Sequence, residues 1–310
     1  MRQINRLFLA GLLVVITLGV GGLYLLHCVQ LRRQALALIH RARSAEAAGD
    51  LDQAAESLSR YLELRRHDAA AWALYACVTD RRSPLRDRSQ VVLIHEEALR
   101  FNPGDRQLER RCAEIALEIQ RHEDALRHVN RLLETLGSAP DATAEMADLE
   151  DLRGKCLEAE SNFDDAETSY RQSITHDPAR IVTYDRLARL LRRHRPEREP
   201  ADRVIDAMMT ANPGSALAHV DRWRYRREFG PAADDRDIAR ALDLGPDEVD
   251  VLIAATELAL RNKDIDGARR HLERGLKSHP TNVMLYQMAS GLELAEHHAD
   301  RAEAVARRGV

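Results

Sequence analysis

The sequence predicts an all-α protein, a solenoid of helix-turn-helix repeats that follows one N-terminal transmembrane helix. Three observations lead to this fold class. An uncharged run extends from Leu7 to Leu26, prolines recur about every 34 residues in the second half of the chain, and only 4% of the 310 residues are aromatic. Alanine and leucine must therefore supply most of the packing, which favours closely spaced helices over a β-sandwich.

The N-terminal run is long enough to cross a bilayer. Arg2 and Arg6 precede it, and its twenty residues would form about 30 Å of helix, the thickness of the hydrocarbon layer. A cleaved signal peptide is the alternative, but the run exceeds a usual apolar signal region and no small-residue cleavage pattern follows it. Cys28 resembles a lipoprotein site only loosely, because His27 precedes it. We therefore predict a membrane anchor over residues 1–34.

The charges around this run predict its orientation. The short basic leader favours an N-terminus inside the cell and repeats exported to the periplasm or another extracytoplasmic space, although Arg32 and Arg33 lie just beyond the run. After residue 34 the chain carries 42 basic and 50 acidic residues, a net charge of −8. Such an acidic body argues against general nucleic-acid binding.

The spacing of the prolines reveals a repeat. Pro178, Pro213, Pro246 and Pro280 are 35, 33 and 34 residues apart, and Pro103 lies two periods and seven further residues before the first of them. Proline ends the preceding helix, because the residue before it is pushed out of the helical region of backbone space. Each unit is therefore expected to close at its proline.

The same apolar pattern surrounds these prolines. A small residue stands twelve positions before the proline and a larger apolar or aromatic one eight positions before it, which are steps along one helix face. Tyr184, Leu252 and Tyr286 stand six positions after their prolines, and short turns such as Gly49-Asp50-Leu51 separate the two helices of a unit. The structural positions of the clearest copies are Ala166, Tyr170, Pro178, Tyr184, Ala268, Leu272, Pro280 and Tyr286.

These residues resemble the tetratricopeptide repeat family, whose 34-residue unit has a small residue early in its second helix and a closing proline. The resemblance implies a right-handed α-solenoid in which each helix pair packs on its neighbours, with a concave surface built by the first helices. It implies about eight repeats over residues 35–310. Their expected boundaries are 35–68, 71–105, 106–139, 147–180, 181–215, 216–248, 249–282 and an incomplete 283–310.

Several copies depart from this pattern. Arg66 stands where the first copy should have its proline, extra residues around Pro140 follow the third copy, and Asp234 occupies the small position of the sixth. The last copy stops at Val310, before a closing proline or a polar capping helix. We therefore expect the native chain to continue with further repeats or another domain.

No pattern in the sequence predicts catalysis, a cofactor or a metal site. The four cysteines lack C-x-x-C spacing, and Cys112 and Cys156 occupy first-helix positions where a small core residue is expected. His122 and His128 are six residues apart and off a shared helix face, whereas zinc-binding helices use i, i+4 spacing. The chain also lacks a glycine-rich phosphate loop and the hydrolase and kinase signatures. We therefore expect no enzymatic activity.

Arginine is concentrated on two successive repeats. The resemblance places Asp185 and Val220 on the concave surface together with the candidate partner-binding residues. These candidates are Arg189, Arg192, Arg193, Arg224 and Arg227. Their guanidinium groups could bind carboxylates or phosphates in a bidentate manner, which predicts an acidic partner. The alternative is a solvated arginine-rich face in a chain that has few lysines.

The family acts mainly as a docking platform for peptides and other proteins. The resemblance therefore implies a membrane-anchored scaffold that presents a concave helical surface to its partners and has no catalysis of its own. A second hypothesis is the N-terminal docking arm of a larger enzyme whose catalytic domain lies beyond Val310. A third is nucleic-acid binding through the arginines, which predicts steep salt dependence and is disfavoured by the acidic body.

Overall fold

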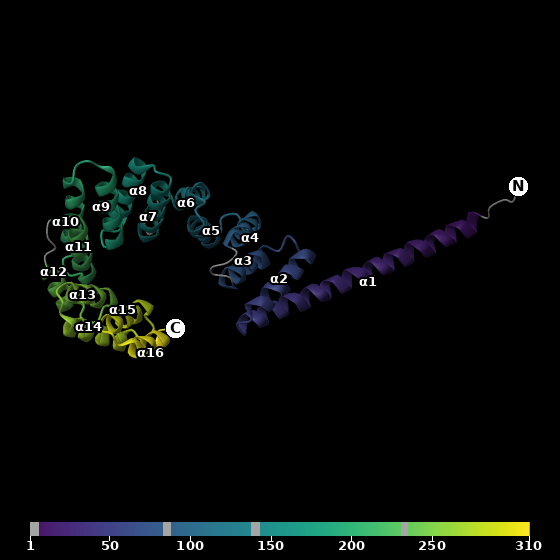
Figure 1. Ribbon diagram of the computed structural model, residues 1–310. Coiled ribbons are helices and arrows are strands. Elements are labelled where there is room, and N and C mark those ends of the chain that lie inside the picture. The colour runs from purple at the N-terminus through teal and green to yellow at the C-terminus, as the bar shows by residue number, and fades with distance from the viewer. Residues whose placement is uncertain (1–5, 83–87, 138–142, 231–234, 310) are drawn as a thin grey trace. The chain divides into compact units, whose positions relative to one another are not determined.

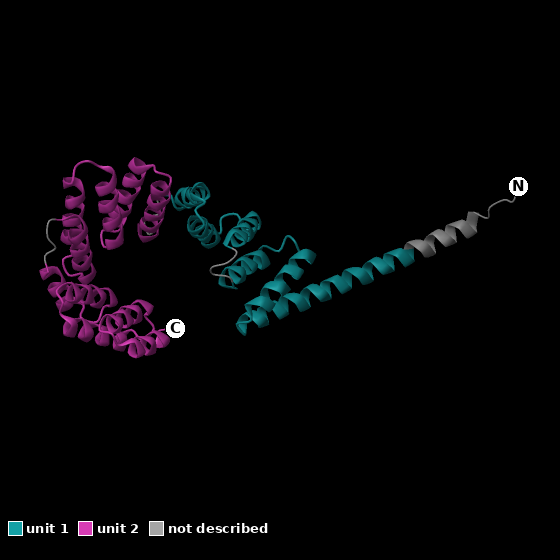
Figure 2. Ribbon diagram, in the orientation of Figure 1, with its two compact units in different colours: residues 1–137 teal, residues 138–310 magenta. Residues whose placement is uncertain are grey.

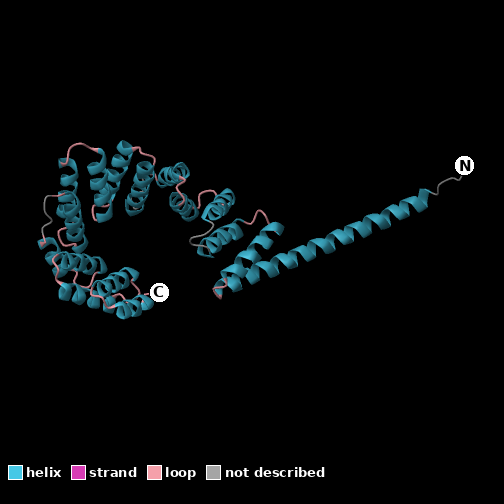
Figure 3. Ribbon diagram, viewed as in Figure 1, coloured by secondary structure: helices cyan, strands magenta, loops and turns pink. Residues whose placement is uncertain are grey.

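The computed structural model describes residues 6–82, 88–137, 143–230 and 235–309, with side chains from residue 18 onward. Every regular element in these ranges is an α-helix (Figure 3), which confirms the predicted all-α class. The chain divides into two compact units, residues 1–137 and residues 138–310 (Figure 2). Arg2, Pro140, Asp234 and Val310, which entered the predictions above, lie outside the described residues.

Unit 1 contains six described helices, and each packs on the next along the chain (Figure 1). They are α1 (Arg6–Ala47), α2 (Leu51–Leu64), α3 (Ala69–Arg82), α4 (Arg88–Phe101), α5 (Arg106–Glu118) and α6 (His122–Leu136). Alanines dominate the contact between α1 and α2, where Ala42, Ala45, Ala54 and Ala55 are buried around Leu58. Small side chains let these helices approach closely, as the low aromatic content led us to expect.

Unit 2 contains ten described helices, again packed as successive neighbours. They are α7 (Thr143–Ala159), α8 (Phe163–His176), α9 (Ile181–His194), α10 (Glu199–Ala211), α11 (Ala216–Phe229), α12 (Arg236–Leu244), α13 (Val249–Arg261), α14 (Ile265–Ser278), α15 (Val283–Ala295) and α16 (Ala299–Arg308). Helix α11 also contacts α9 on one side and α13 on the other. These three first helices of successive pairs therefore lie side by side, and they form the face on which the candidate site is built.

The predicted membrane anchor is not supported. Among the described residues, no helix combines the length and the apolar character that a bilayer crossing needs. Instead of an anchor that ends at residue 34, α1 continues without a break to Ala47, and its last turns pack on α2 through Ala35 and Ala42. The predicted single-pass localisation, with the N-terminus inside and exported repeats, is therefore wrong.

Five turns inside helix pairs share one backbone feature, a residue in the left-handed region. These residues are Gly49, Gln120, Ser161, Lys263 and His297, with φ between 59° and 79°. In two of these turns the residue that follows caps the second helix with its side chain. The Asp50 carboxylate accepts a hydrogen bond from the Gln53 amide at 3.0 Å, and that of Asp264 accepts one from the Gly267 amide at 2.8 Å. An acceptor at this position satisfies an otherwise unpaired amide of the first helical turn.

Residues that precede the closing prolines connect one inter-pair turn to the turn before it. The Asn102 side-chain amide donates to the Ala69 carbonyl at 2.8 Å, and that of Asn212 donates to the Pro178 carbonyl at 3.0 Å. Both donors reach back about one repeat length. At these two positions the pre-proline asparagine therefore ends its helix and also links successive pairs.

The residues that define the repeat pattern are packed as the pattern suggests. Ala166, Tyr170, Tyr184, Ala268 and Leu272 are buried. Pro178 and Pro280 lie in turns between helix pairs, and the Tyr286 hydroxyl donates to the Pro280 carbonyl at 3.1 Å. The Tyr170 ring packs against Gly154 of α7, where a Cβ atom would lie 2.5 Å from that ring. A side chain there would force α7 and α8 apart.

Candidate interaction face

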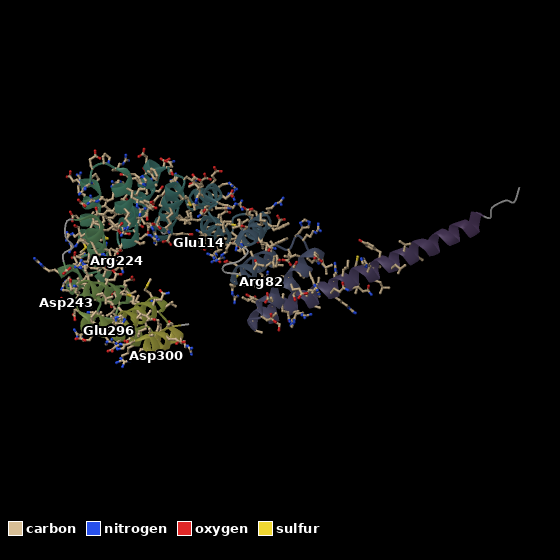
Figure 4. All side chains as sticks on the ribbon, viewed as in Figure 1. Arg82, Glu114, Arg224, Asp243, Glu296 and Asp300 are labelled. Carbon is tan, nitrogen blue, oxygen red and sulfur yellow. The ribbon has the colours of Figure 1, made fainter. Side chains whose placement is uncertain are left out.

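The predicted arginines are divided between two neighbouring helices of unit 2. Arg189, Arg192 and Arg193 lie on α9, whereas Arg224 and Arg227 lie on α11 (Figure 4 labels Arg224). The Ser215 hydroxyl caps α11 by accepting a hydrogen bond from the Ala218 amide at 3.3 Å. Unit 2 buries Val220 and Trp223 of this helix in its core, whereas Arg224 and Arg227 keep 26% and 42% of their side-chain surface exposed.

Arg189 links α9 to α11. Its Nε donates to both oxygens of Asp185 at 2.9 and 2.8 Å, and its Nη1 donates to Glu228 of α11. Burial lowers the pKa of Arg189, but the hydrogen bonds with Asp185 and Glu228 outweigh burial and raise it. This guanidinium is therefore charged and already engaged by two carboxylates.

Arg224 and Arg227 make the corresponding links from α11 to α13. Arg224 Nη1 lies 3.7 Å from Asp221 and 3.6 Å from Asp250, and Arg227 Nη1 donates to Glu257 at 2.5 Å. We name the charged residues that connect α9, α11 and α13 the ion-pair ladder. The ladder consists of Asp185, Arg189, Asp221, Arg224, Arg227, Glu228, Asp250 and Glu257.

The ladder contains five carboxylates and three arginines. Its most buried acid is Asp221, whose pKa is raised to about 6 by burial and by the neighbouring charge of Asp185, against the opposing effect of Arg224. An acid with a raised pKa shows that its charged form lacks full compensation. The ladder therefore presents an excess of negative charge above pH 6.

Arg192 and Arg193 do not join the ladder. Arg192 Nε donates to the Tyr225 hydroxyl at 2.7 Å and its Nη2 donates to Asp202 at 2.6 Å, while its guanidinium lies over the Tyr225 ring at 5.4 Å. Arg193 Nη1 lies 3.7 Å from Glu158 of α7. Only Arg189, Arg224 and Arg227 among the predicted arginines are thus brought together by the fold.

A pocket of about 400 Å³ borders Arg192, between the α9–α10 turn and the end of α11. Tyr225 and Phe229 line it together with Asp202 and Arg198. Burial and the hydrogen bond to Asp202 raise the pKa of Tyr225 to about 12, so its hydroxyl stays protonated and donates. Arg198 forms no ion pair with any residue that the structure describes.

Sequence reasoning misplaced one residue and missed four of the five acids of the ladder. Val220, expected on the exposed surface, is fully buried with Trp223 and Ile238. The i, i+4 spacing of Asp185 and Arg189 was a signal for one ion pair within a helix. Nothing in the sequence pairs α11 with Glu257, because that contact depends on how two separate helices pack.

Outside the ladder, the histidines, cysteines and acids that could hold a metal or react are engaged in contacts within the fold. Glu293, Glu296 and His298 lie close enough to hold a cation, but Arg269 forms ion pairs with both glutamates. Cys112 and Cys156 are buried, and burial raises the pKa of each thiol to about 12, as suits small core residues. The buried His128 contacts Glu109 at 2.7 Å, whereas His122 lies at the start of the same helix, α6.

Known structures resemble this chain at the level of the fold. No protein-family model and no curated protein sequence matches it. A tetratricopeptide repeat protein from Parabacteroides merdae matches with a TM-score of 0.51 and 15% identity, over 89% of this chain and 92% of that one. The chain has the tetratricopeptide-repeat fold.

Two further tetratricopeptide-fold matches are partial. YrrB, a TPR protein with an unusual peptide-binding site, is 19% identical over 62% of this chain and 94% of its own, with a TM-score of 0.49. MamA is 10% identical over 64% of this chain and 97% of its own, also with a TM-score of 0.49. At such low sequence identities, structural similarity shows the fold alone, and the function has to be argued from the residues of the site.

Proposed function

We propose that the chain is a scaffold that docks protein or peptide partners, without catalysis of its own, and that the ion-pair ladder is a docking face. The observation that carries this proposal is the ladder itself. Its side chains come from three neighbouring helices, yet they keep between 14% and 50% of their surface exposed. The repeat fold supports the proposal, because stacked helix pairs create extended surfaces for partners.

The ladder favours a partner with basic side chains. An acidic partner, predicted from the arginines alone, would have to displace carboxylates from Arg189, Arg224 and Arg227. Each of these guanidinium groups has a carboxylate within 3.6 Å. A basic partner meets the two unmatched acids instead, and complementary charge speeds association and selects the partner.

Fluorescence anisotropy with two labelled peptides of equal length tests the charge preference. One peptide carries arginine at every third position and the other carries glutamate there, both at low ionic strength. We expect the arginine peptide to bind more tightly, and Asp250→Asn combined with Glu257→Gln to weaken it about fivefold. Tighter binding of the glutamate peptide would support an acidic partner instead. Equal binding of both peptides would contradict the proposal that the ladder is a docking face.

Asp243→Asn is the matched control for this experiment. Asp243 is an exposed acid of α12, labelled in Figure 4, and it lies 3.9 Å from Arg240, outside the ladder. Its neutralisation removes one negative charge from unit 2, as each ladder substitution does, so it is compared with Asp250→Asn and with Glu257→Gln made singly. Binding that falls equally in this control would show a general charge effect, with no role for the ladder.

The predicted repeat boundaries belong to the same proposal. Each of the eight predicted repeats overlaps one successive helix pair, from α1–α2 to α15–α16, which supports the division, although α1, α3 and α7 begin before the predicted bounds. The alternative role as the docking arm of a larger enzyme stays a prediction. It would use the same docking face, so the peptide experiment applies to both.

A further inference from the structure

Unit 1 holds a pocket of about 320 Å³ that the ladder does not involve. It lies between α2 and α4, which are the second helices of successive pairs, and α3, which lies between them in the chain. Leu62 is one of its buried residues, and Trp72, Tyr75 and Phe101 line it with partly exposed rings. Ligand pockets range upward from about 300 Å³, so this one has room for a single long side chain.

The aromatic wall of the pocket is held in place before any ligand binds. The Trp72 and Phe101 rings are parallel within 6° with centroids 5.7 Å apart, and Tyr75 meets Trp72 edge-on at 6.1 Å. The Trp72 indole N–H donates to the Arg66 carbonyl at 2.8 Å. A wall fixed by packing and by a hydrogen bond loses little entropy on binding.

Carboxylates stand at the rim of this wall. Glu63 is exposed and forms no ion pair within the described ranges, whereas Glu97 pairs with Arg100 at 2.9 Å at the surface, where such a pair contributes little. Arg66 is the single cation of the lining. Glu63 is therefore the acid of the rim that has no ion-pair partner among the described residues, and aromatic faces attract cations through their quadrupoles.

We infer that this pocket binds an arginine side chain of a partner peptide. A guanidinium is planar, so it can lie against the Trp72 ring while its N–H groups reach the Glu63 or Glu97 carboxylate. Its aliphatic stem suits the apolar wall beside Leu62. The pocket and the ladder share no residue, so either site can fail without the other.

Trp72 reports on its own pocket, because the chain has two tryptophans and the other, Trp223, is fully buried. The probe is the capped pentapeptide Gly-Ser-Arg-Ser-Gly, titrated into the full chain while tryptophan emission is followed. Counterparts with leucine or glutamate at the centre test the chemistry. We expect saturable binding of the arginine peptide, with the leucine peptide about threefold weaker and the glutamate peptide weaker still.

Charge variants of the rim should shift this affinity in opposite directions. Glu63→Gln combined with Glu97→Gln should weaken the arginine peptide about threefold, and Arg66→Gln should strengthen it about twofold. All three residues are at the surface, so the fold does not depend on them. Glu56→Gln is the control, since Glu56 is exposed on α2 and pairs with Arg60 outside the pocket.

Two results would overturn the inference. One is a leucine peptide that binds as tightly as the arginine peptide, which would make the pocket a general apolar site. The other is an affinity that none of the rim variants changes. The ladder variant with Asp250→Asn and Glu257→Gln should leave the Trp72 titration unchanged, so failure of the ladder proposal would not be mistaken for failure of this one.

Discussion

The two tryptophans of the chain show how differently the two units use an aromatic ring. Trp72, in α3 of unit 1, is partly exposed and forms the wall of a pocket. Trp223, in α11 of unit 2, is fully buried, and the Arg227 guanidinium lies 4.6 Å from its ring centroid. Both rings belong to first helices of their pairs. The Trp72 ring is therefore available to a ligand, whereas the Trp223 ring packs beneath the ion-pair ladder.

The neighbouring residues explain the difference. Trp72 stacks on Phe101, and the space beside this stack is left open between α2 and α4. Trp223 is surrounded by Ala216, Val220 and Ile238, whose side chains close over it. An aromatic residue in the first helix of a pair thus becomes a binding surface or a core residue according to the side chains that the adjacent helices supply.

The largest expected effect is the loss of the buried ring. Trp223→Ala should lower the free energy of unfolding of unit 2 by about 4 kcal/mol, because it leaves a large cavity under the ladder. Trp72→Ala should cost about 2 kcal/mol or less, because that ring is already partly in water. Urea unfolding with hydrogen exchange resolved by unit measures both. Equal losses would mean that Trp72 is as structural as Trp223.

Neutralising Asp221 should stabilise unit 2. Its pKa is raised to about 6 from 3.8, so the folded state holds its proton more tightly than the unfolded state does. Protonated Asp221 therefore favours the folded state, and this contribution to the free energy of unfolding is fully present below pH 3.8 and is lost as the pH rises through 6. Asp221→Asn should therefore gain about 2 kcal/mol at pH 8, and this gain should vanish near pH 4. Thermal melts across this range measure it, and a gain independent of pH would contradict the assignment.

Neutralising Asp80 in unit 1 should have the opposite sign. Burial raises the pKa of Asp80, but hydrogen bonds from Arg111 at 2.6 Å and from Arg88 at 2.5 Å outweigh burial and lower it. Because its pKa is lowered in the folded state, ionised Asp80 stabilises the fold above pH 3.8. This stabilisation is lost as the pH falls and the carboxylate becomes protonated. Asp80→Asn should cost about 2 kcal/mol at pH 7. The cost should shrink in melts recorded below pH 4, and a cost that stays constant would reject the ion-pair explanation.

The smallest expected effects are equal in the two units. Asn102→Ala and Asn212→Ala each remove side-chain hydrogen bonds that reach back to the preceding inter-pair turn. Each should cost about 1 kcal/mol, because a neutral hydrogen bond contributes that much. Chemical unfolding of the two variants compares them directly. A clear inequality would show that the two units do not stack their helix pairs by the same means.

The repeat was predictable because its signals are local. The spacing of Pro178, Pro213, Pro246 and Pro280 marks where helices end, and a proline has that effect wherever it stands. The left-handed turn residues were less visible, since Gly49 is a glycine but Lys263 and His297 are not. There the packing of the helix pair imposes a backbone conformation that the residue type does not favour.

The sites were less predictable than the repeat. The arginines of α9 and α11 were visible, yet their partners Glu228 and Glu257 were not, because helix packing selects those partners. Likewise, the aromatic wall of the pocket was not visible in the sequence, because the parallel stack of Trp72 on Phe101 brings together residues 29 positions apart. The sequence also did not show that residues 1–34 are no separate element, because α1 runs on to Ala47 and its last turns pack on α2.

The sequence alone determined that this protein is a series of helix pairs, because helix ends and apolar faces depend on residues three, four or about 34 positions apart. Only the tertiary structure decided what those pairs present to a partner. In the folded chain, Arg189, Arg224 and Arg227 form ion pairs with a larger number of carboxylates, and Trp72 lines an open pocket. Charge and exposure depend on the neighbours that other helices bring, and a linear pattern does not specify them.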